Sequence, residues 1–281
     1  MTRMHRPETL DEAAALLSSA EDAMVYGGGT AIQILRKQGI LFTEDFIDIS
    51  RIPGLHDITV TDQDVTVGAM VSVRQMEQDS RIRHAVPLAS SAYSKVANPR
   101  VRNTASVAGN IAHGDYRLDP PTSLLVLDAT VMITSVRGTR EVPIREFFVD
   151  FQVTDVAEDE MISAIRVPNQ PQRSAGRFMK FSSLSANDWP CASVAALATE
   201  QSGSVTLQLG LGALAPTSVY LSLTFDPNVG EQDMVDAALD RVNSAMEPIA
   251  DVRGGVEYKA RIGRVIVEDA VRSVLKEVPR A

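Results

Sequence analysis

Ala23-Met24-Val25-Tyr26-Gly27-Gly28-Gly29-Thr30 is the stretch that decides the fold, because three consecutive glycines follow a short apolar run. The apolar run predicts a buried strand at residues 23–26. Residues 31–38 have the composition of a helix, and Gly39 is suited to close it. Phe46-Ile47-Asp48-Ile49 predicts the next strand. The order strand, glycine turn, helix and strand indicates a compact α/β unit.

The three glycines fit a phosphate-binding turn. Without Cβ atoms the backbone can turn sharply, and its N–H groups can approach an anion closely. The start of the following helix adds free N–H donors and a partial positive charge. The stretch lacks both the Lys-Ser or Lys-Thr pair of nucleotide hydrolases and the G-x-G-x-x-G spacing of a dinucleotide turn. A tight turn without a ligand explains the glycines equally well, so both interpretations stay open.

A second run of small residues lies at Ser106-Val107-Ala108-Gly109-Asn110, with His113-Gly114-Asp115 and Asp119 close behind. The backbone is again accessible there, and Ser106 and Asn110 can form hydrogen bonds through a hydroxyl and an amide. Two such segments suit a ligand with two phosphates. Taken alone, this segment fits an irregular connection better than a binding site. The sequence pattern offers His113 no partner residue, so we do not assign it a role in acid–base catalysis.

The rest of the chain predicts further elements around these two segments. Thr9-Leu10-Asp11-Glu12 fits a capping box before a helix at 13–17. A Pro- and Gln-rich stretch at 168–176 indicates a domain boundary, and strands followed by helices beyond it predict an α+β domain. The remaining predicted elements are a hairpin at 58–67, a helix at 76–88, a strand-rich region at 124–136, strands at 177–182 and 205–213, and helices at 232–245 and 261–276.

Composition restricts the possible functions. The net charge of −9 over 281 residues argues against nucleic acid, which requires clustered Lys and Arg. The acidic residues after Arg6 argue against a signal peptide, and no apolar stretch is long enough to span a membrane, so we expect a cytoplasmic protein. Cys191 is the single cysteine and cannot hold an iron–sulfur cluster; an inert packing role fits it best. The four histidines lack metal-ligand spacing, so any chemistry on this chain needs either ordinary side chains or a bound organic cofactor.

The order of these motifs resembles the FAD-binding medium subunits of the molybdenum hydroxylases, the carbon monoxide dehydrogenase and xanthine dehydrogenase group. The resemblance begins at Tyr26–Thr30 and extends over most of the chain. It rests on 26–30, 98–103, 106–110, 119–121, 127–129, 142–148, 180–181, 188–189 and 209–217. The sequence departs from the family pattern in two places. Ala108 stands where a glycine is usual, and Gly114-Asp115-Tyr116 stands in place of the residues that usually follow the histidine, here His113.

The resemblance implies an α+β fold. A two-part FAD-binding domain of the vanillyl-alcohol-oxidase type would span residues 1–170, with subdomains of about 1–54 and 55–170. A smaller α+β C-terminal domain would follow at 171–281. The implied cofactor-binding residues are Gly27, Gly28, Gly29, Thr30, Ala31, Ser106, Val107, Gly109, Asn110, Asp119 and Lys180. No catalytic side chain and no metal ligand are implied on this chain.

The resemblance also implies a function and partners. The chain would carry electrons from [2Fe–2S] clusters on a small partner subunit to an external acceptor, while a large partner subunit holds the molybdopterin. The expected assembly is a dimer of heterotrimers. Two alternatives stay open: a free-standing FAD-dependent oxidoreductase, and an assembly subunit that has lost the cofactor. Trp189 could approach the flavin, although an aromatic residue beside a small-residue run is more often part of a core.

Overall fold

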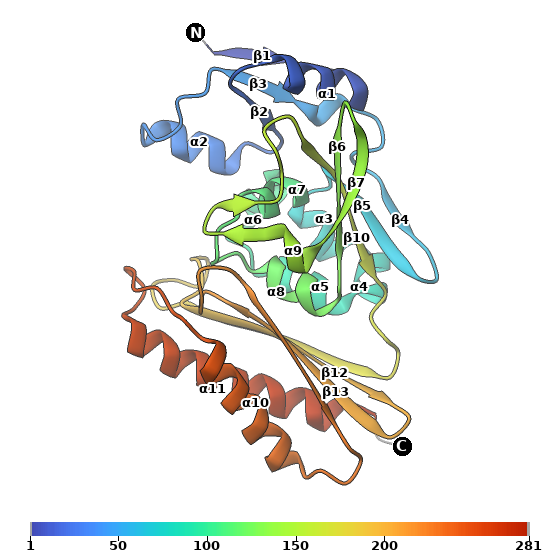
Figure 1. Ribbon diagram of the computed structural model, residues 1–281, viewed down its shortest axis with the longest axis vertical. Coiled ribbons are helices and arrows are strands. Elements are labelled where there is room, and N and C mark those ends of the chain that lie inside the picture. The colour runs from blue at the N-terminus through green and yellow to red at the C-terminus, as the bar shows by residue number, and fades with distance from the viewer. Residues whose placement is uncertain (1, 280–281) are drawn as a thin grey trace.

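The computed structural model describes residues 2–279 (Figure 1). The first unit is a parallel sheet in the order β1 (Arg3–His5), β3 (Asp45–Asp48) and β2 (Ala23–Tyr26), with α1 (Leu10–Ser19) and α2 (Thr30–Lys37). The predicted order of strand, glycine turn, helix and strand is therefore confirmed. A 3₁₀ turn, η1 (Ile49–Arg51), follows β3. Thr9 caps α1 by accepting a hydrogen bond from the Glu12 amide, but the Glu12 carboxylate accepts from the Glu8 amide, one residue earlier than a capping box requires.

A second, antiparallel sheet lies on the right of the upper part of the molecule in Figure 1. Its strands are β4 (Ile58–Val60), β5 (Asp64–Gly68), β10 (Met161–Pro168), β6 (Thr130–Ser135) and β7 (Gly138–Pro143), in that spatial order. The predicted hairpin at 58–67 is confirmed by the pairing of β4 with β5. The central strand β10 pairs with both β5 and β6, although it follows β5 by more than ninety residues in the chain.

The helix predicted at 76–88 is wrong in its extent, because the chain forms three short helices there. They are α3 (Val73–Gln78), α4 (Ser80–Ala85) and α5 (Pro87–Tyr93). Asp79 is extended and caps α4 by accepting a hydrogen bond from the Arg81 amide at 2.8 Å. Val86 leaves the helical region because it precedes a proline, which then occupies the first position of α5.

The region 124–136 is only partly strand. Its first residues belong to α8 (Pro120–Val126), all of whose side chains are buried. Asp128, at φ +56, then turns the chain into β6. A short apolar run is compatible with both a buried helix and a buried strand, which explains why a strand was expected where the end of α8 lies. The shorter elements of this part are α6 (Pro99–Thr104), α7 (Val107–Ala112), α9 (Ile144–Phe147), β8 (Phe148–Asp150) and β9 (Val153–Thr154).

Residues beyond 173 form a four-stranded antiparallel sheet with two helices on one face (Figure 1). Its elements are β11 (Ser174–Phe181), β12 (Ala192–Gln201), β13 (Ser204–Gly212), β14 (Val219–Phe225), α10 (Glu231–Ala245) and α11 (Val256–Glu277). The helices and this sheet share one apolar core. Cys191 lies fully buried just before β12, where burial raises the pKa of its thiol. The exact domain boundary at residue 170 stays a prediction.

Helix α8 lies directly on β13. A Cβ atom added at Gly210 would come within 2.1 Å of the Thr122 carbonyl oxygen. One added at Gly212 would come within 2.9 Å of the Thr122 side chain. The glycines of β13 therefore let a helix of the first part approach the sheet of the last part at backbone distance. Within residues 2–279, no helix has both the length and the apolar composition needed to cross a membrane.

Gly210→Ala is expected to lower the free energy of unfolding by about 1–3 kcal/mol, because its methyl group would overlap the backbone of α8. Gly255→Ala is the matched control. The Gly255 Cβ position is open and its φ is −75°, so only the weaker N-cap that alanine forms on α11 is expected to matter, at about 0.5 kcal/mol. Urea denaturation measures both variants. Wild-type stability of Gly210→Ala would contradict the close packing of α8.

Candidate functional site

The first glycine turn joins β2 to α2. Gly29 has φ +68, a left-handed conformation suited to glycine, and it caps α2. The Tyr26 ring covers this residue so closely that a Cβ at Gly29 would lie 2.1 Å from its hydroxyl. Gln33 donates a hydrogen bond to the same hydroxyl at 3.3 Å. The tyrosine thus fixes the turn, while none of the side chains of α2 itself is buried.

The two small-residue segments predicted from the sequence meet in space. A Cβ added at Gly27 would lie 2.8 Å from the Ser106 hydroxyl. One added at Gly28 would lie 1.8 Å from the Thr104 carbonyl oxygen and 3.0 Å from the Ala105 Cα. Only glycine permits this approach of one backbone to another. Thr104 and Ala105 were missed in the sequence, because a residue that contributes only its main chain leaves no signal there.

Most N–H groups of the second segment, residues 106–110, donate hydrogen bonds to other groups of the protein. The amides of Val107 and Ala108 donate to the carbonyl oxygens of Val71 (2.9 Å) and Ala69 (3.3 Å). The Gly109 amide donates to the Ser106 hydroxyl, which caps α7. The alanine at position 108 is buried and hydrogen-bonded, so its methyl group is part of the packing.

The first turn keeps its N–H groups free. The amides of Gly28 and Gly29 donate to no acceptor in the described part of the chain. The amides of Thr30 and Ala31 begin α2 and have no partner within the helix. Four donors on consecutive residues, next to a helix N-terminus, are suited to bind an anion. Ser106 and Asn110 add a hydroxyl and an amide from the second segment.

Two side-chain oxygens near these segments are buried without a hydrogen-bond partner among residues 2–279. They are Asn110 Oδ1 and Asp119 Oδ1. A buried polar atom without a partner is costly, and a bound polar ligand would satisfy it. Both atoms belong to predicted site residues and both are acceptors, so they fit a cofactor that carries hydroxyl or N–H donors.

Asp119 and Lys180 form a buried ion pair. Lys180 Nζ lies 2.7 Å from Asp119 Oδ2 and also donates to the Lys95 carbonyl oxygen at 3.0 Å. Both side chains are only about one twentieth exposed. Burial raises the pKa of the Asp119 carboxyl to about 7, against the opposing effect of the Lys180 charge. The predicted residues 119 and 180 therefore lie together, at the start of α8 and the end of β11.

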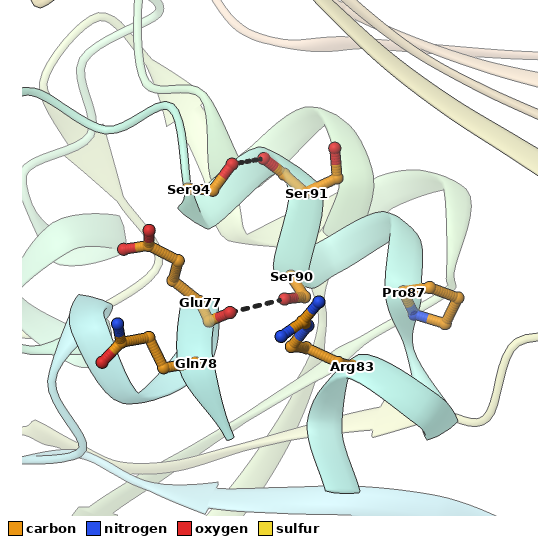
Figure 2. A pocket seen from close by; sticks show the side chains of 7 residues that line it. All are labelled: Glu77, Gln78, Arg83, Pro87, Ser90, Ser91 and Ser94. Carbon is orange, nitrogen blue, oxygen red and sulfur yellow. Dashed lines mark hydrogen bonds between the residues drawn. The ribbon is translucent and has the colours of Figure 1, made fainter. Parts of the chain in front are cut away.

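One surface cavity lies away from these residues. It measures about 530 Å³ and is lined by Glu77, Gln78, Arg83, Pro87, Ser90, Ser91 and Ser94, from α3, α4 and α5 and the residue after α5 (Figure 2). Ser90 donates to the Glu77 carbonyl oxygen across it at 3.2 Å. None of the predicted site residues lines this cavity. No group of three or more His, Cys, Asp or Glu suited to a metal ion occurs within residues 2–279.

Comparison with known proteins gives a consistent result. The family model described as "FAD binding domain in molybdopterin dehydrogenase" matches residues 1–170. The carbon monoxide dehydrogenase medium chain of Hydrogenophaga pseudoflava is 29% identical over 96% of this chain and 95% of its own. The xanthine dehydrogenase FAD-binding subunit of Escherichia coli is 31% identical over 76% of this chain and 75% of its own. A solved structure of carbon monoxide dehydrogenase from H. pseudoflava, lacking its Mo-pyranopterin moiety, matches with a TM-score of 0.92 at 28% identity, covering 99% of this chain and 98% of that one.

Gly28→Ala is expected to weaken FAD binding by about tenfold or more, because its methyl group would push apart the two segments at Thr104. Gly27→Ala is the matched variant next to it. Its methyl group would meet the Ser106 hydroxyl and the Met70 sulfur, which are side-chain atoms and not main chain, so a smaller loss is expected. Titration with FAD, together with denaturation to check folding, measures both. Equal affinities of the two folded variants would refute the role of the backbone contact.

Asp119 is expected to make stability depend on pH. Its folded pKa of about 7 lies above the ordinary value of 3.8, so the folded protein binds an extra proton between these values. The free energy of unfolding should therefore fall by up to about 1.4 kcal/mol per pH unit as pH rises from 4 to 7, relative to Asp119→Asn. Denaturation of both proteins across this range gives the slopes. Parallel slopes would mean that the carboxyl titrates as it does in the unfolded chain.

Proposed function

Because the chain belongs to the family of FAD-binding domains of molybdopterin dehydrogenases, we propose that it is the FAD-binding electron-transfer subunit of a multi-subunit molybdenum hydroxylase. The observation that carries the proposal is the contact of Gly27 and Gly28 with residues 104–106. It joins two segments, far apart in the sequence and each suited to approach a ligand, into one place.

We assign the diphosphate of FAD to the first turn. The free amides of Gly28, Gly29, Thr30 and Ala31 would donate to its oxygens, and the N-terminus of α2 would add its partial positive charge. From the second segment, the Ser106 hydroxyl and the Asn110 side chain would complete the contacts. Val107 and Gly109 would act mainly by shaping the backbone, since their N–H groups already have acceptors.

We assign Asp119 and Lys180 to the isoalloxazine end of the cofactor. FAD supplies the redox chemistry when bound, since it can take up one or two electrons. The buried Lys180 ammonium would favour negative charge next to it. The Asp119 carboxyl, with a pKa of about 7, could hold a proton at Oδ1 or release it near neutral pH. No side chain of this chain is assigned as a nucleophile.

The relatives are named as medium chains or FAD-binding subunits, which supports a role within a larger complex. We propose a small partner with [2Fe–2S] clusters as electron donor, and a large molybdopterin-binding partner that hydroxylates the substrate. The complete assembly would be a dimer of such heterotrimers in the cytoplasm. Electrons would leave this chain to an external acceptor.

Co-expression of the chain with its partner subunits tests the proposal. FAD is expected at one per chain, and both partners are expected to co-purify with it. A folded, colourless chain that does not bind added FAD would refute the proposal and favour an assembly subunit without a cofactor. A chain that carries FAD, forms no complex and oxidises a substrate alone would favour a free-standing oxidoreductase.

A further inference from the structure

Ser193, near the start of β12, carries a buried hydroxyl that the site described so far does not use. The residue is fully buried, and its hydroxyl has no hydrogen-bond partner among residues 2–279. In the antiparallel register, Ser193 lies between Lys180 of β11 and Gly212 of β13. Side chains of residues directly opposite one another in such a sheet share a face. Ser193 therefore lies on the face from which Lys180 reaches Asp119.

This face is covered by α8 and by the residues before it. The Cβ position of Gly212 lies 2.4 Å from the Ser193 hydroxyl oxygen. The same point lies 2.9 Å from Thr122 Cγ2 and 3.6 Å from the Leu118 carbonyl oxygen. Because Asp119 directly follows Leu118, the serine hydroxyl and the beginning of α8 share one small buried region. Glycine at position 212 keeps this region open, since a side chain there would overlap the hydroxyl.

Three oxygen atoms of this region have no hydrogen-bond partner within the described part of the chain. Ser193 Oγ and Asp119 Oδ1 are buried side-chain atoms, and the third is the Leu118 carbonyl oxygen. Only the serine hydroxyl among them is both a donor and an acceptor. One water molecule can satisfy all three, because it can accept from the serine and donate to the other two oxygens. A buried water in proteins has about three such partners.

The charged groups around Asp119 leave Oδ1 available to this water. Lys180 Nζ, from β11, lies 2.7 Å from the other carboxylate oxygen, Oδ2. Lys95, which follows α5, also favours the charged form of the carboxyl. A carboxylate oxygen accepts two hydrogen bonds, so a water at Oδ1 still leaves a position for a donor of the cofactor.

We propose that Ser193 is a positioning residue that holds one buried water between its own hydroxyl, Asp119 Oδ1 and the Leu118 carbonyl oxygen. The water donates to Asp119 Oδ1 and thereby stabilises the ionised carboxyl. Its effect on the cofactor rests on the proposed function: Ser193 sets how readily Asp119 releases its proton beside the isoalloxazine, and hence how the flavin potential depends on pH.

The test compares Ser193→Ala with the wild-type chain by denaturation between pH 4 and 9. Each protein is measured against the same protein carrying Asp119→Asn, so that the difference reports the titration of Asp119 alone. The folded pKa of this carboxyl is about 7, so the wild-type difference in free energy of unfolding is expected to fall until about pH 7. In Ser193→Ala it is expected to keep falling until about pH 8, an increase of about tenfold in proton affinity, because the ionised carboxyl loses a donor.

Thr199→Val is the matched control. Thr199 belongs to the same strand, and its hydroxyl is also buried without a partner among residues 2–279. It lies six residues further along β12, which is about 20 Å from Ser193, so its pH profile is expected to follow the wild type. Ser193→Cys keeps a weak S–H donor and is expected to give an intermediate profile. It replaces the alanine variant if that variant does not fold.

Redox titration of the FAD-loaded chains at each pH extends the test to the cofactor. The pH at which the slope of the flavin potential changes is expected to rise by about one unit in Ser193→Ala and to stay unchanged in Thr199→Val.

An unshifted stability profile in folded Ser193→Ala, or an equal shift in Thr199→Val, overturns the inference. A shifted stability profile with an unchanged flavin profile overturns the link from Ser193 to the cofactor. If the wild-type chain does not bind FAD, the proposed function fails, whereas the stability profile requires no FAD and still decides whether Ser193 acts on Asp119.

Discussion

The structure depends on one contact between two stretches of main chain. Gly27 and Gly28 lie against Thr104, Ala105 and Ser106 so closely that any side chain at position 28 would overlap a carbonyl group. The contact sets the position of α2 relative to α7, and hence of the free amides relative to the hydroxyl and amide side chains. Packing within the protein therefore already requires glycine in this turn, in addition to any need for its backbone to approach a phosphate.

The sequence predicted the elements whose signals are local. Periodicity and capping residues predicted the strand at 23–26, the glycine turn, the hairpin at 58–67 and the last two helices. The errors lie where tertiary context decides. An extended aspartate divides the helix that was expected to run from Met76 up to Pro87, and burial on both sides made α8 look like a strand.

The candidate site could be predicted only in part. Glycine and small-residue runs indicated where a ligand could approach, and the family resemblance supplied Asp119 and Lys180. The sequence could not indicate that these two pair with each other, because their contact joins the start of α8 to the end of β11. Nor could it indicate that the amides of Val107 and Ala108 are occupied by the carbonyl groups of Val71 and Ala69.

The central position of β10 has a consequence for synthesis on the ribosome. Ser163 of this strand accepts a hydrogen bond from the Ala69 amide, and the Ala69 carbonyl in turn holds the Ala108 amide. The segment 106–110, which we propose as part of the cofactor site, is therefore braced by a strand that leaves the ribosome well after both small-residue segments. Since domains fold as units during translation, a nascent chain that ends before residue 161 lacks this brace. This brace can therefore form only after more than half of the polypeptide has been made.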